Sequence, residues 1–290
     1  MEVKPGYKQT EVGVIPEDWD AVPISSLTPQ NRKNGIVDGP FGSNLKTIHY
    51  RTSGIPIITS GYVTDGKFHA EKYLYVDRSK FLEEKRSAVQ PGDIVMAKIG
   101  ERCGASAILP HTHETGILSG NALKITVDEL RHSTSFVWQM LWNLHVSGKL
   151  EVLRTVGAQP ALSMANLKRF KISVPPTKAE QVSIATALSD VDGLLGGLDR
   201  LIAKKRDLKQ AAMQQLLTGQ TRLPGFHGEW NMHRIGQLGE TYGGLTGKTK
   251  ADFGLGSARY ITFLNVLNNV VIDTNCFENV HVRPSDLLPA

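Results

Sequence analysis

The stretch Trp19-Asp20-Ala21-Val22-Pro23-Ile24-Ser25-Ser26-Leu27 recurs in outline as Trp230-Asn231-Met232-His233-Arg234-Ile235-Gly236-Gln237-Leu238, with tryptophan, isoleucine and leucine at one constant offset. At a slightly shorter offset, Ile58-Thr59 recurs as Ile261-Thr262. An internal repeat decides more about a fold than any single motif does, because each copy is one structural unit. The sequence therefore predicts two related units.

The two copies differ in their continuation. The first copy extends through a strand-like Ile94-Val95-Met96 to Pro175-Pro176 before a charged helical pattern begins, whereas the sequence ends before the second copy reaches a counterpart. We expect one complete unit over residues 1–175, a helical spacer over 176–219, and the truncated start of a second unit over 220–290.

Composition limits the class of protein. With 290 residues, 40% of them apolar, the chain is long enough to form two compact units. No apolar run approaches the roughly 18 residues of a membrane span, and the N-terminus lacks the apolar stretch of a secretion signal. Cys103 and Cys276 have no C-x-x-C partner, so neither disulfides nor a zinc knuckle are expected. These features predict a soluble, cytoplasmic protein with no membrane partner.

Short apolar segments separated by turns dominate residues 55 to 127. We predict strands at Ile55–Ile58, Tyr73–Val76 and Ile94–Ala97, with a turn at Thr64-Asp65-Gly66. Further along, Ser133 is placed to cap a helix that ends near Gly148. The apolar face of that helix would consist of Phe136, Val137, Met140, Leu141 and Leu144. The first unit is therefore predicted to be α+β, with a helix supporting a β-rich sheet.

The spacer has the apolar pattern of a coiled coil. Steps of four and three residues separate the members of this pattern, which we call the apolar seam: Ile184, Leu188, Val191, Leu195, Leu198 and Ile202. A single long helix cannot bury such a seam on itself, so we expect another helix to cover it, from this chain or from another. Gly193, Gly196 and Gly197 lie inside the pattern and each costs about 1 kcal/mol relative to alanine, so we also expect a kink or a weak point there.

Positive charge gathers at the end of the spacer. The net charge of the whole chain is only +5, but residues 198–222 hold six basic side chains against the two acids Asp199 and Asp207. This excess fits either a solvated helix face or contact with phosphate groups.

We find no set of residues suited to catalysis. His111, His113 and Glu114 lie in a turn without the spacing of a metal site. Asp93 and Lys98 are the nearest approach to a nuclease site, beside Asp77, Glu83 and Lys85, but neither set has the usual tight spacing. A cofactor loop and the Asn/Asp-Pro-Pro-aromatic element of a base methyltransferase are also missing. The sequence predicts a binding protein with no catalytic residue, no metal and no cofactor.

Polar side chains in the loops of the first unit suit contact with a nucleic acid. Amides, hydroxyls and cations of this kind bind phosphates and base edges. The candidates for DNA binding are Asn44, Lys46, Ser60, Lys98, Arg102, Ser119, Asn121 and Gln159. Each of these residues alone fits an ordinary surface position, and together they favour double-stranded DNA as the partner.

Several motifs together resemble the specificity subunit of type I restriction–modification systems. They are the leading segment from Tyr7 to Trp19, Pro91-Gly92-Asp93-Ile94-Val95, Pro175-Pro176-x-x-x-Glu180-Gln181 at the start of the long helix, and Gln214-Gln215-Leu216-Leu217-Thr218-Gly219 at its end. The resemblance covers essentially the whole chain.

The resemblance implies a division of labour between subunits. Two target-recognition domains, separated by two antiparallel helices, each read half of a split DNA sequence. Methylation (M) subunits dock on this scaffold and supply the adenine methyltransferase, and a restriction (R) subunit supplies the translocase and nuclease. By this resemblance residues 20–175 form a DNA-reading domain and residues 176–219 form a docking and pairing helix, without an active site of their own.

The sequence departs from the family pattern in its second half, where the second recognition domain is cut off and the second long helix is missing. Two chains could then cover each other's seam and read a palindromic split site. A gene remnant, a structural adaptor that no longer reads DNA, and a DNA nuclease or modification enzyme with an unrecognised site remain alternatives. The target sequence cannot be predicted from one chain.

Overall fold

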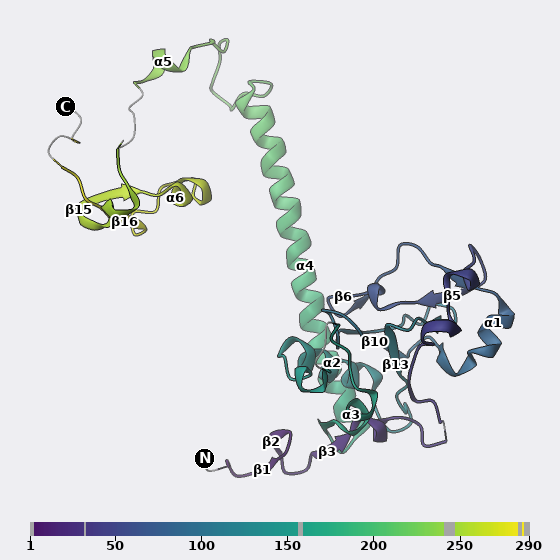
Figure 1. Cartoon of the computed structure of the whole chain (residues 1–290). Helices are drawn as coiled ribbons and strands as arrows, with labels where there is room; N and C mark the ends of the chain where they lie inside the picture. Colours follow the sequence, from purple (N-terminus) through teal and green to yellow (C-terminus); the bar gives the residue numbers. More distant parts are fainter. Residues whose placement is uncertain (1–2, 32, 156–158, 241–246, 284–285, 287–290) are drawn as a thin grey trace. The chain divides into compact units, whose positions relative to one another are not determined.

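The computed structural model describes residues 3–31, 33–155, 159–240, 247–283 and 286 (Figure 1). The chain divides into an N-terminal unit, residues 1–206, and a C-terminal unit, residues 207–290. The boundary falls inside the long helix α4 (Lys178–Leu217). The predicted domain bounds at residues 175 and 219 enclose α4 and stay a prediction, whereas the boundary of the compact units lies within this helix.

Two four-stranded sheets form the centre of the N-terminal unit, with strand orders β11-β10-β13-β4 and β8-β5-β12-β9. The strands of the first sheet are β4 (Ile36–Asp38), β10 (Ile94–Ala97), β11 (Ser106–Ile108) and β13 (Ala122–Ile125), and those of the second are β5 (Ile55–Ile58), β8 (Tyr75–Val76), β9 (Ala88–Val89) and β12 (Gly116–Leu118). The first sheet is antiparallel throughout, while β5 and β12 pair in parallel. The predicted strands at 55–58 and 94–97 are confirmed, and the predicted strand at 73–76 is limited to its last two residues.

Strand β10 is buried on both faces. Ile94 and Met96 pack with α2 (Thr134–Val146), whereas Val95 and Ala97 pack with residues of the second sheet. Because both faces are covered, every residue of β10 is apolar and buried, which explains its continuous hydrophobic run. The first sheet thus forms the middle layer between α2 and the second sheet.

Helix α2 begins as predicted. The side chain of Ser133 accepts a hydrogen bond from the backbone N–H of Phe136, and Gly148 follows the helix with a φ of 72°. Phe136, Val137, Leu141 and Leu144 are buried in the core, and Met140 packs against it. The predicted apolar face is therefore confirmed.

The remaining elements of the N-terminal unit are short. They are the hairpin of β1 (Tyr7–Thr10) and β2 (Gly13–Pro16), the pair of β3 (Asp20–Pro23) and β14 (Lys171–Val174), the hairpin of β6 (Val63–Thr64) and β7 (Lys67–Phe68), and the helices α1 (Arg78–Glu83) and α3 (Met164–Arg169). The predicted turn at 64–66 joins β6 to β7, with positive φ at Asp65 and Gly66.

Helix α4 is continuous from Lys178 to Leu217, and Figure 1 shows no sharp kink in it. Of the kink or weak point expected at Gly193, Gly196 and Gly197, the kink is therefore wrong, and a weak point stays a prediction. Glycine loses more conformational entropy than other residues when a helix forms, but helical dihedral angles cause it no steric conflict. The helix therefore continues through these three positions at a cost in stability. Within the described ranges, no helix combines the length and hydrophobicity needed to cross a bilayer.

The C-terminal unit repeats the local structure of the first sequence copy. Ile24–Leu27 forms a single turn of 3-10 helix, η1, and its counterpart Ile235–Leu238 forms α5. Thr59 caps the short helix η4 (Ser60–Tyr62) at the end of β5, just as Thr262 caps α6 (Phe263–Asn268) at the end of β15 (Phe253–Ile261). A final strand, β16 (Phe277–Val280), pairs with β15.

The two copies differ in burial. Ile24 and Leu27 are fully buried, whereas Ile235 and Leu238 are 79% and 72% exposed. The predicted internal repeat is thus confirmed in local structure, but only the first copy packs these side chains into a core.

Candidate nucleic-acid interface

Strand direction brings four loops of the N-terminal unit to one edge. Strands β5 and β12 are parallel, so both end on the same side, and β4 and β10 share a direction because each is antiparallel to β13. Since β12 leads directly into β13, the two sheets meet at this side. We call the gathered loops the recognition edge, which consists of residues 39–46, 59–62, 98–104 and 119–121.

Two glycines allow the loops of the recognition edge to touch through their backbones. A Cβ at Gly39 would lie 2.0 Å from the carbonyl oxygen of Ser119, and one at Gly120 would lie 2.9 Å from the carbonyl oxygen of Pro40. Any larger side chain would force these backbones apart. The first and fourth loops therefore hold each other at a fixed spacing.

Asn121 is the centre of the polar contacts on the edge. Its Oδ1 accepts a hydrogen bond from the backbone N–H of Ser60 at 3.3 Å and another from the hydroxyl of Ser119. Its carbonyl oxygen accepts the backbone N–H of Lys98 at 2.9 Å. These two hydrogen bonds to Oδ1 fix the orientation of the side-chain amide. Asn121 is exposed, and its Nδ2 has no hydrogen-bond partner among the described residues. Three of the four loops are thus joined at one residue, two of them through its side chain and the third through its backbone.

Lys98 lies under the edge rather than on it. Its ammonium is 2.6 Å from a carboxylate oxygen of Asp38 and 3.9 Å from the ring centre of Phe41, and the residue is only 7% exposed. Burial raises the pKa of the Asp38 carboxyl, but the hydrogen bond and charge of Lys98, with a smaller part from Arg86, outweigh burial and lower it. We expect Lys98 to position the first and third loops, so direct phosphate contact by Lys98, although predicted, is disfavoured.

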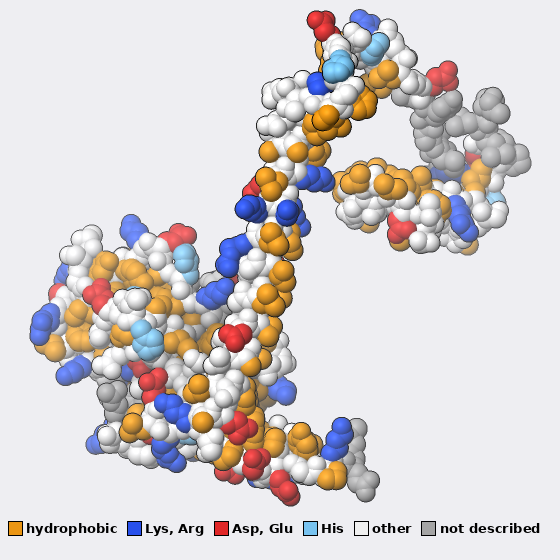
Figure 2. All heavy atoms as spheres, turned by 180° about the vertical axis from the view of Figure 1, so that it is seen from behind, with side chains coloured by type: hydrophobic (Ala, Val, Ile, Leu, Met, Phe, Trp, Pro, Cys, Tyr) orange, Lys and Arg blue, Asp and Glu red, His pale blue; other side chains and the backbone are white. Residues whose placement is uncertain are grey.

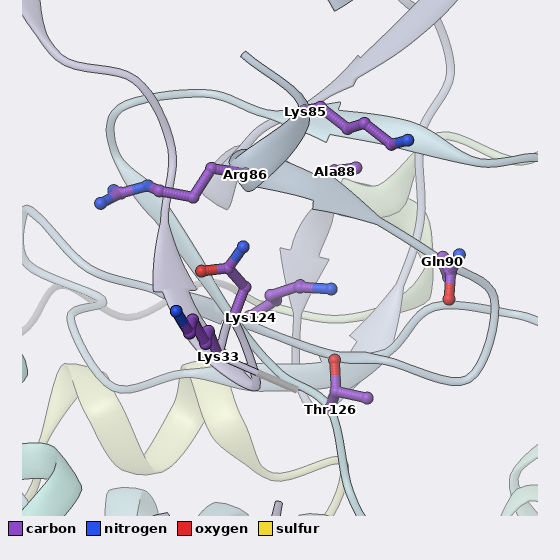
Figure 3. Close-up of a pocket in the computed structure, with 8 residues that line it drawn as sticks. Lys33, Lys85, Arg86, Ala88, Gln90, Lys124 and Thr126 are labelled. Atoms are coloured by element: carbon purple, nitrogen blue, oxygen red, sulfur yellow. The ribbon is translucent and has the colours of Figure 1, made fainter. Parts of the chain in front are cut away.

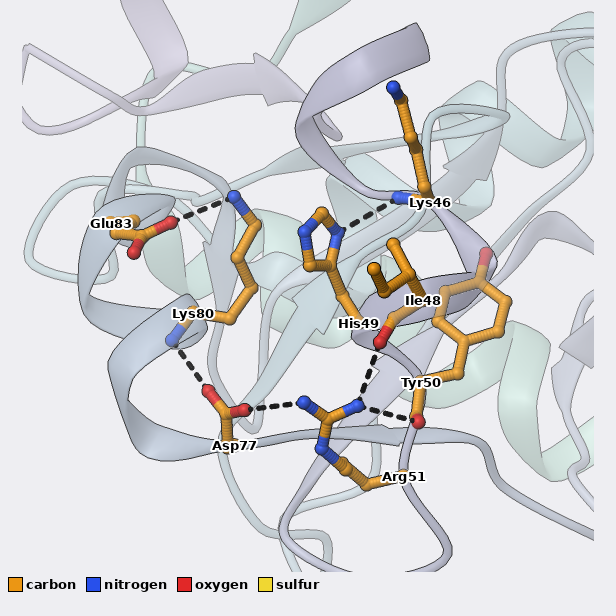
Figure 4. A network of polar contacts seen from close by, with 8 residues as sticks. All are labelled: Lys46, Ile48, His49, Tyr50, Arg51, Asp77, Lys80 and Glu83. Atoms are coloured by element: carbon orange, nitrogen blue, oxygen red, sulfur yellow. Dashed lines mark hydrogen bonds and ion pairs between the residues drawn. The ribbon is translucent and has the colours of Figure 1, made fainter.

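Lys46 projects from a segment that is fixed by a separate network (Figure 4). The backbone N–H of Lys46 donates to Nδ1 of His49 at 3.1 Å. The ammonium of Lys46 has no ion pair within the described chain. Arg51 donates to the carbonyl of Ile48 at 2.9 Å and pairs with Asp77 at 3.1 Å. Asp77 in turn caps α1 through the backbone N–H of Lys80, so the loop that carries Lys46 is anchored to that helix.

The other predicted residues lie around the same edge. Arg102 is exposed and its guanidinium is 3.5 Å from the hydroxyl of Thr64. Gln159 is exposed beside Pro160, whose carbonyl accepts the backbone N–H of Gly100 at 3.0 Å. Asn44 lies in η2 (Gly42–Asn44), and its backbone N–H donates to the carbonyl of Phe41 at 3.1 Å. The structure therefore places six of the eight predicted residues on the recognition edge, Lys98 beneath it and Gln159 next to it.

Sequence reasoning missed Asp38 and Phe41, which hold Lys98 in place. The turn-forming run Asp38-Gly39-Pro40-Phe41-Gly42 marks a loop, but nothing in it reveals a lysine partner 60 positions away.

Asp93 and Lys98, the nearest approach to a nuclease site, do not pair with each other. Asp93 is 3% exposed and binds Lys124 at 2.9 Å, the hydroxyl of Thr126 at 2.6 Å and the backbone N–H of Gln90 at 2.8 Å. Lys98 therefore pairs with Asp38 and not with Asp93. In the part of the chain that the structure describes, no three His, Cys, Asp or Glu side chains are grouped to hold a metal ion.

The start of α4 is attached to the N-terminal unit by the Glu180-Gln181 pair. The indole N–H of Trp19 donates to Glu180 at 3.2 Å. Gln181 is 1% exposed, accepts the backbone N–H of Ser133 at 2.9 Å and donates to the carbonyl of Pro175 at 3.3 Å. Buried polar side chains satisfied in this way fix one orientation, so these contacts set the direction in which α4 leaves the sheet.

Beyond this attachment the apolar seam of α4 is largely open to solvent. Leu188, Val191, Leu195, Leu198 and Ile202 are between 47% and 55% exposed. Figure 2 shows hydrophobic side chains along the length of α4. The beginning of the seam also forms one wall of a groove of about 670 Å³, whose other wall includes Trp138 and Trp142 of α2. The structure thus confirms an uncovered apolar surface on this helix.

Comparison with known proteins gives one concordant result. A family model described as the type I restriction modification DNA specificity domain matches residues 16–203, which is more than half of the chain. Two Methanocaldococcus jannaschii proteins, whose names assign them to the specificity subunits of the type I restriction enzymes MjaX and MjaVIII, are 26% and 24% identical over 73% and 75% of this chain. The chain spans about half the length of these relatives, 48% and 49%.

Solved structures show the same fold. A chain from a structure of the type I R-M system matches 72% of this chain with a TM-score of 0.53 and 14% identity, over 48% of its own length. The HsdS subunit from Thermoanaerobacter tengcongensis matches 72% of this chain with a TM-score of 0.50 and 14% identity, over 47% of its own length.

Proposed function

Because the chain belongs to the type I restriction modification DNA specificity family, we propose that it is a non-catalytic DNA-binding subunit whose recognition edge reads one half of a bipartite target. The observation that carries the proposal is the convergence of the loops on Asn121, which fixes donors and acceptors relative to one another. Sequence readout requires such fixed polar groups, since base pairs differ in their pattern of donors and acceptors.

The residues of the edge divide into two roles. Lys46 and Arg102 are exposed cations and suit the phosphate backbone, which sets affinity and register. The amides of Asn44, Asn121 and Gln159 suit base edges, since an amide can donate and accept at once. Ser60 and Ser119 fix the orientation of Asn121, and Lys98 supports the loops from below.

Helix α4 is proposed as the docking and pairing element. Each half-exposed leucine of the seam would gain roughly 1 kcal/mol or more by full burial, so a second helix along the seam is favourable. We propose that two chains pair through this seam and present two recognition edges to a palindromic split target. The methylation subunits, and through them the restriction subunit, would assemble on the same scaffold. A cytoplasmic location remains the prediction for such an assembly.

Selection from a pool of random DNA duplexes tests the reading function. The full chain, in buffer of stated salt concentration, should enrich one short conserved sequence, because salt-dependent phosphate contacts alone give no sequence preference. Recovery of duplexes without any shared sequence, from protein that is folded and binds DNA, would reject the proposal in favour of a structural adaptor.

Sedimentation analysis tests the pairing. The chain should form a dimer at micromolar concentration, and the selected target should contain the half-site twice in inverted orientation. A monomer at all concentrations, binding a single half-site, would reject pairing while leaving the reading function intact.

A further inference from the structure

A second basic surface of the N-terminal unit belongs to none of the loops of the recognition edge (Figure 3). It is a pocket of about 270 Å³ between the 33–34 turn, strand β13, and the segment from η5 (Lys85–Ser87) to Gln90. Lys33, Lys85, Arg86 and Lys124 supply its charge, and none of the described residues that line it carries a carboxylate. We call it the basic pocket.

The four cations of the basic pocket are not equivalent. Lys124 is bound to Asp93 at 2.9 Å and Arg86 to Asp38 at 2.7 Å. Lys33 and Lys85 are exposed, and neither has an ion pair within the described chain. The uncompensated charge of the pocket therefore resides on these two lysines, which face an opening that also has the amides of Asn34 and Gln90 on its wall.

Asp38 connects the pocket to the recognition edge. One of its carboxylate oxygens binds Arg86 of the pocket at 2.7 Å, and the other binds Lys98 beneath the edge at 2.6 Å. Asp38 thus links Arg86, on one side of the pocket, to the support of the edge. A duplex carries a negative charge for about every 1.7 Å of its axis, so a duplex that extends from the edge past Asp38 would carry phosphates toward the pocket.

We infer that the basic pocket binds a backbone phosphate of the DNA that the recognition edge reads. This inference rests on the proposed function for its ligand. The ammonium groups of Lys33 and Lys85 neutralise the phosphate, while the neutral amides of Asn34 and Gln90 donate hydrogen bonds to its oxygens. Such a contact adds affinity and fixes the register of the duplex, but it carries no sequence information.

The test compares the full wild-type chain with Lys33→Ala/Lys85→Ala in binding a random-sequence duplex across a salt series. Because the pocket neutralises one phosphate, the variant should lose about 0.9 from the salt slope. Between about 50 and 200 mM salt, its affinity should therefore fall about 3.5-fold less than that of the wild type. The charge-matched control, Lys4→Ala/Lys168→Ala, removes two exposed lysines outside both the pocket and the edge, and should keep the wild-type slope. Equal melting temperatures establish that the variants are folded.

Outcomes separate this inference from the proposed function. An unchanged salt slope in Lys33→Ala/Lys85→Ala, with a selected target sequence in the wild type, overturns the pocket alone. A reduced slope without any selected sequence supports the pocket and overturns sequence reading, and failure of the wild type to bind any duplex overturns both. Titration with inorganic phosphate distinguishes a DNA phosphate from a free anion. If the variant loses phosphate binding but keeps the wild-type salt slope for DNA, the pocket binds a free anion and the inference is overturned.

Discussion

Lys98 and Asp38, 60 positions apart in the chain, form an ion pair of 2.6 Å beneath the recognition edge. The pair joins the loop after β4 to the loop after β10, and Phe41 covers the lysine from the other side. Lys98, which sequence reasoning assigns to DNA contact, therefore has a structural role. It belongs to the residues that support the edge and not to those proposed to contact DNA.

Lys98→Met should destabilise the N-terminal unit by about 1–3 kcal/mol, because Asp38 then keeps only Arg86 as a charged partner among the described residues. Lys46→Met, on an exposed lysine without an ion pair in the described ranges, should change stability by less than about 0.5 kcal/mol but weaken DNA binding. Urea unfolding and fluorescence anisotropy measure the two effects. Equal stability of both variants would contradict the structural role of Lys98.

Asn121→Asp separates support of the loops from contact with DNA. The carboxylate still accepts hydrogen bonds from Ser60 and Ser119, so unfolding should change little, whereas the Nδ2 donor is replaced by a negative oxygen and DNA affinity should fall at least about tenfold. Asn121→Ala loses both functions and should also reduce stability by about 1 kcal/mol. If Asn121→Asp binds the selected duplex like the wild type, Asn121 does not face DNA.

Gln181→Ala should loosen the attachment of α4. It leaves the backbone N–H of Ser133 and the carbonyl of Pro175 without their side-chain partner in a buried position, at a cost of about 1–3 kcal/mol. Hydrogen exchange should then accelerate at the first turns of α4 and α2. Gln210→Ala, on an exposed position of the same helix, is the control and should leave exchange there unchanged.

His132 makes stability dependent on pH. Burial, followed by the charge of Arg131, lowers the pKa of His132 below its ordinary value, although Asp128 and Gln181 act in the opposite direction. As pH falls from about 8 to about 5, the unfolded chain takes up the proton first, so the free energy of unfolding decreases. Chemical denaturation at several pH values should show a weaker decrease in His132→Gln. An identical pH dependence in both proteins would refute the assignment.

Leu195→Lys should prevent pairing through α4. A charged side chain at the centre of the seam could not be buried against a second helix, so the dimer should dissociate at concentrations where the wild type is dimeric. Thr186→Lys adds the same charge at an exposed position outside the seam and should remain dimeric. Sedimentation velocity compares the two, and equal association states would show that the seam is not the interface.

Local sequence patterns predicted much of the fold. The apolar run Ile94–Ala97, the cap at Ser133 and the seam of α4 each depend on neighbours close in sequence, and each is found in the structure. The repeat was also visible, since Thr59 and Thr262 cap helices in the same way. The difference in burial between the two copies of the repeat could not be predicted, because burial depends on the packing of segments distant in sequence.

The candidate site was predictable only in part. Polar residues after predicted strands could be selected, but their meeting at one edge depends on strand order and on parallel pairing of β5 with β12, which local pattern does not encode. Lys98 and Asp38 illustrate the limit, as a buried ion pair between residues far apart leaves no periodic signal. The basic pocket was missed for the same reason, because Lys33 and Lys85 come together only in the folded chain.

Photo-crosslinking of the full chain to its selected duplex, with iodouracil replacing single thymines in the target, tests the reading of DNA by the recognition edge most directly. Crosslinked peptides should come from the loops at residues 39–46, 59–62, 98–104 and 119–121, and they should change with the position of the iodouracil. Crosslinks confined to α4 or to the C-terminal unit would contradict the reading of DNA by these loops.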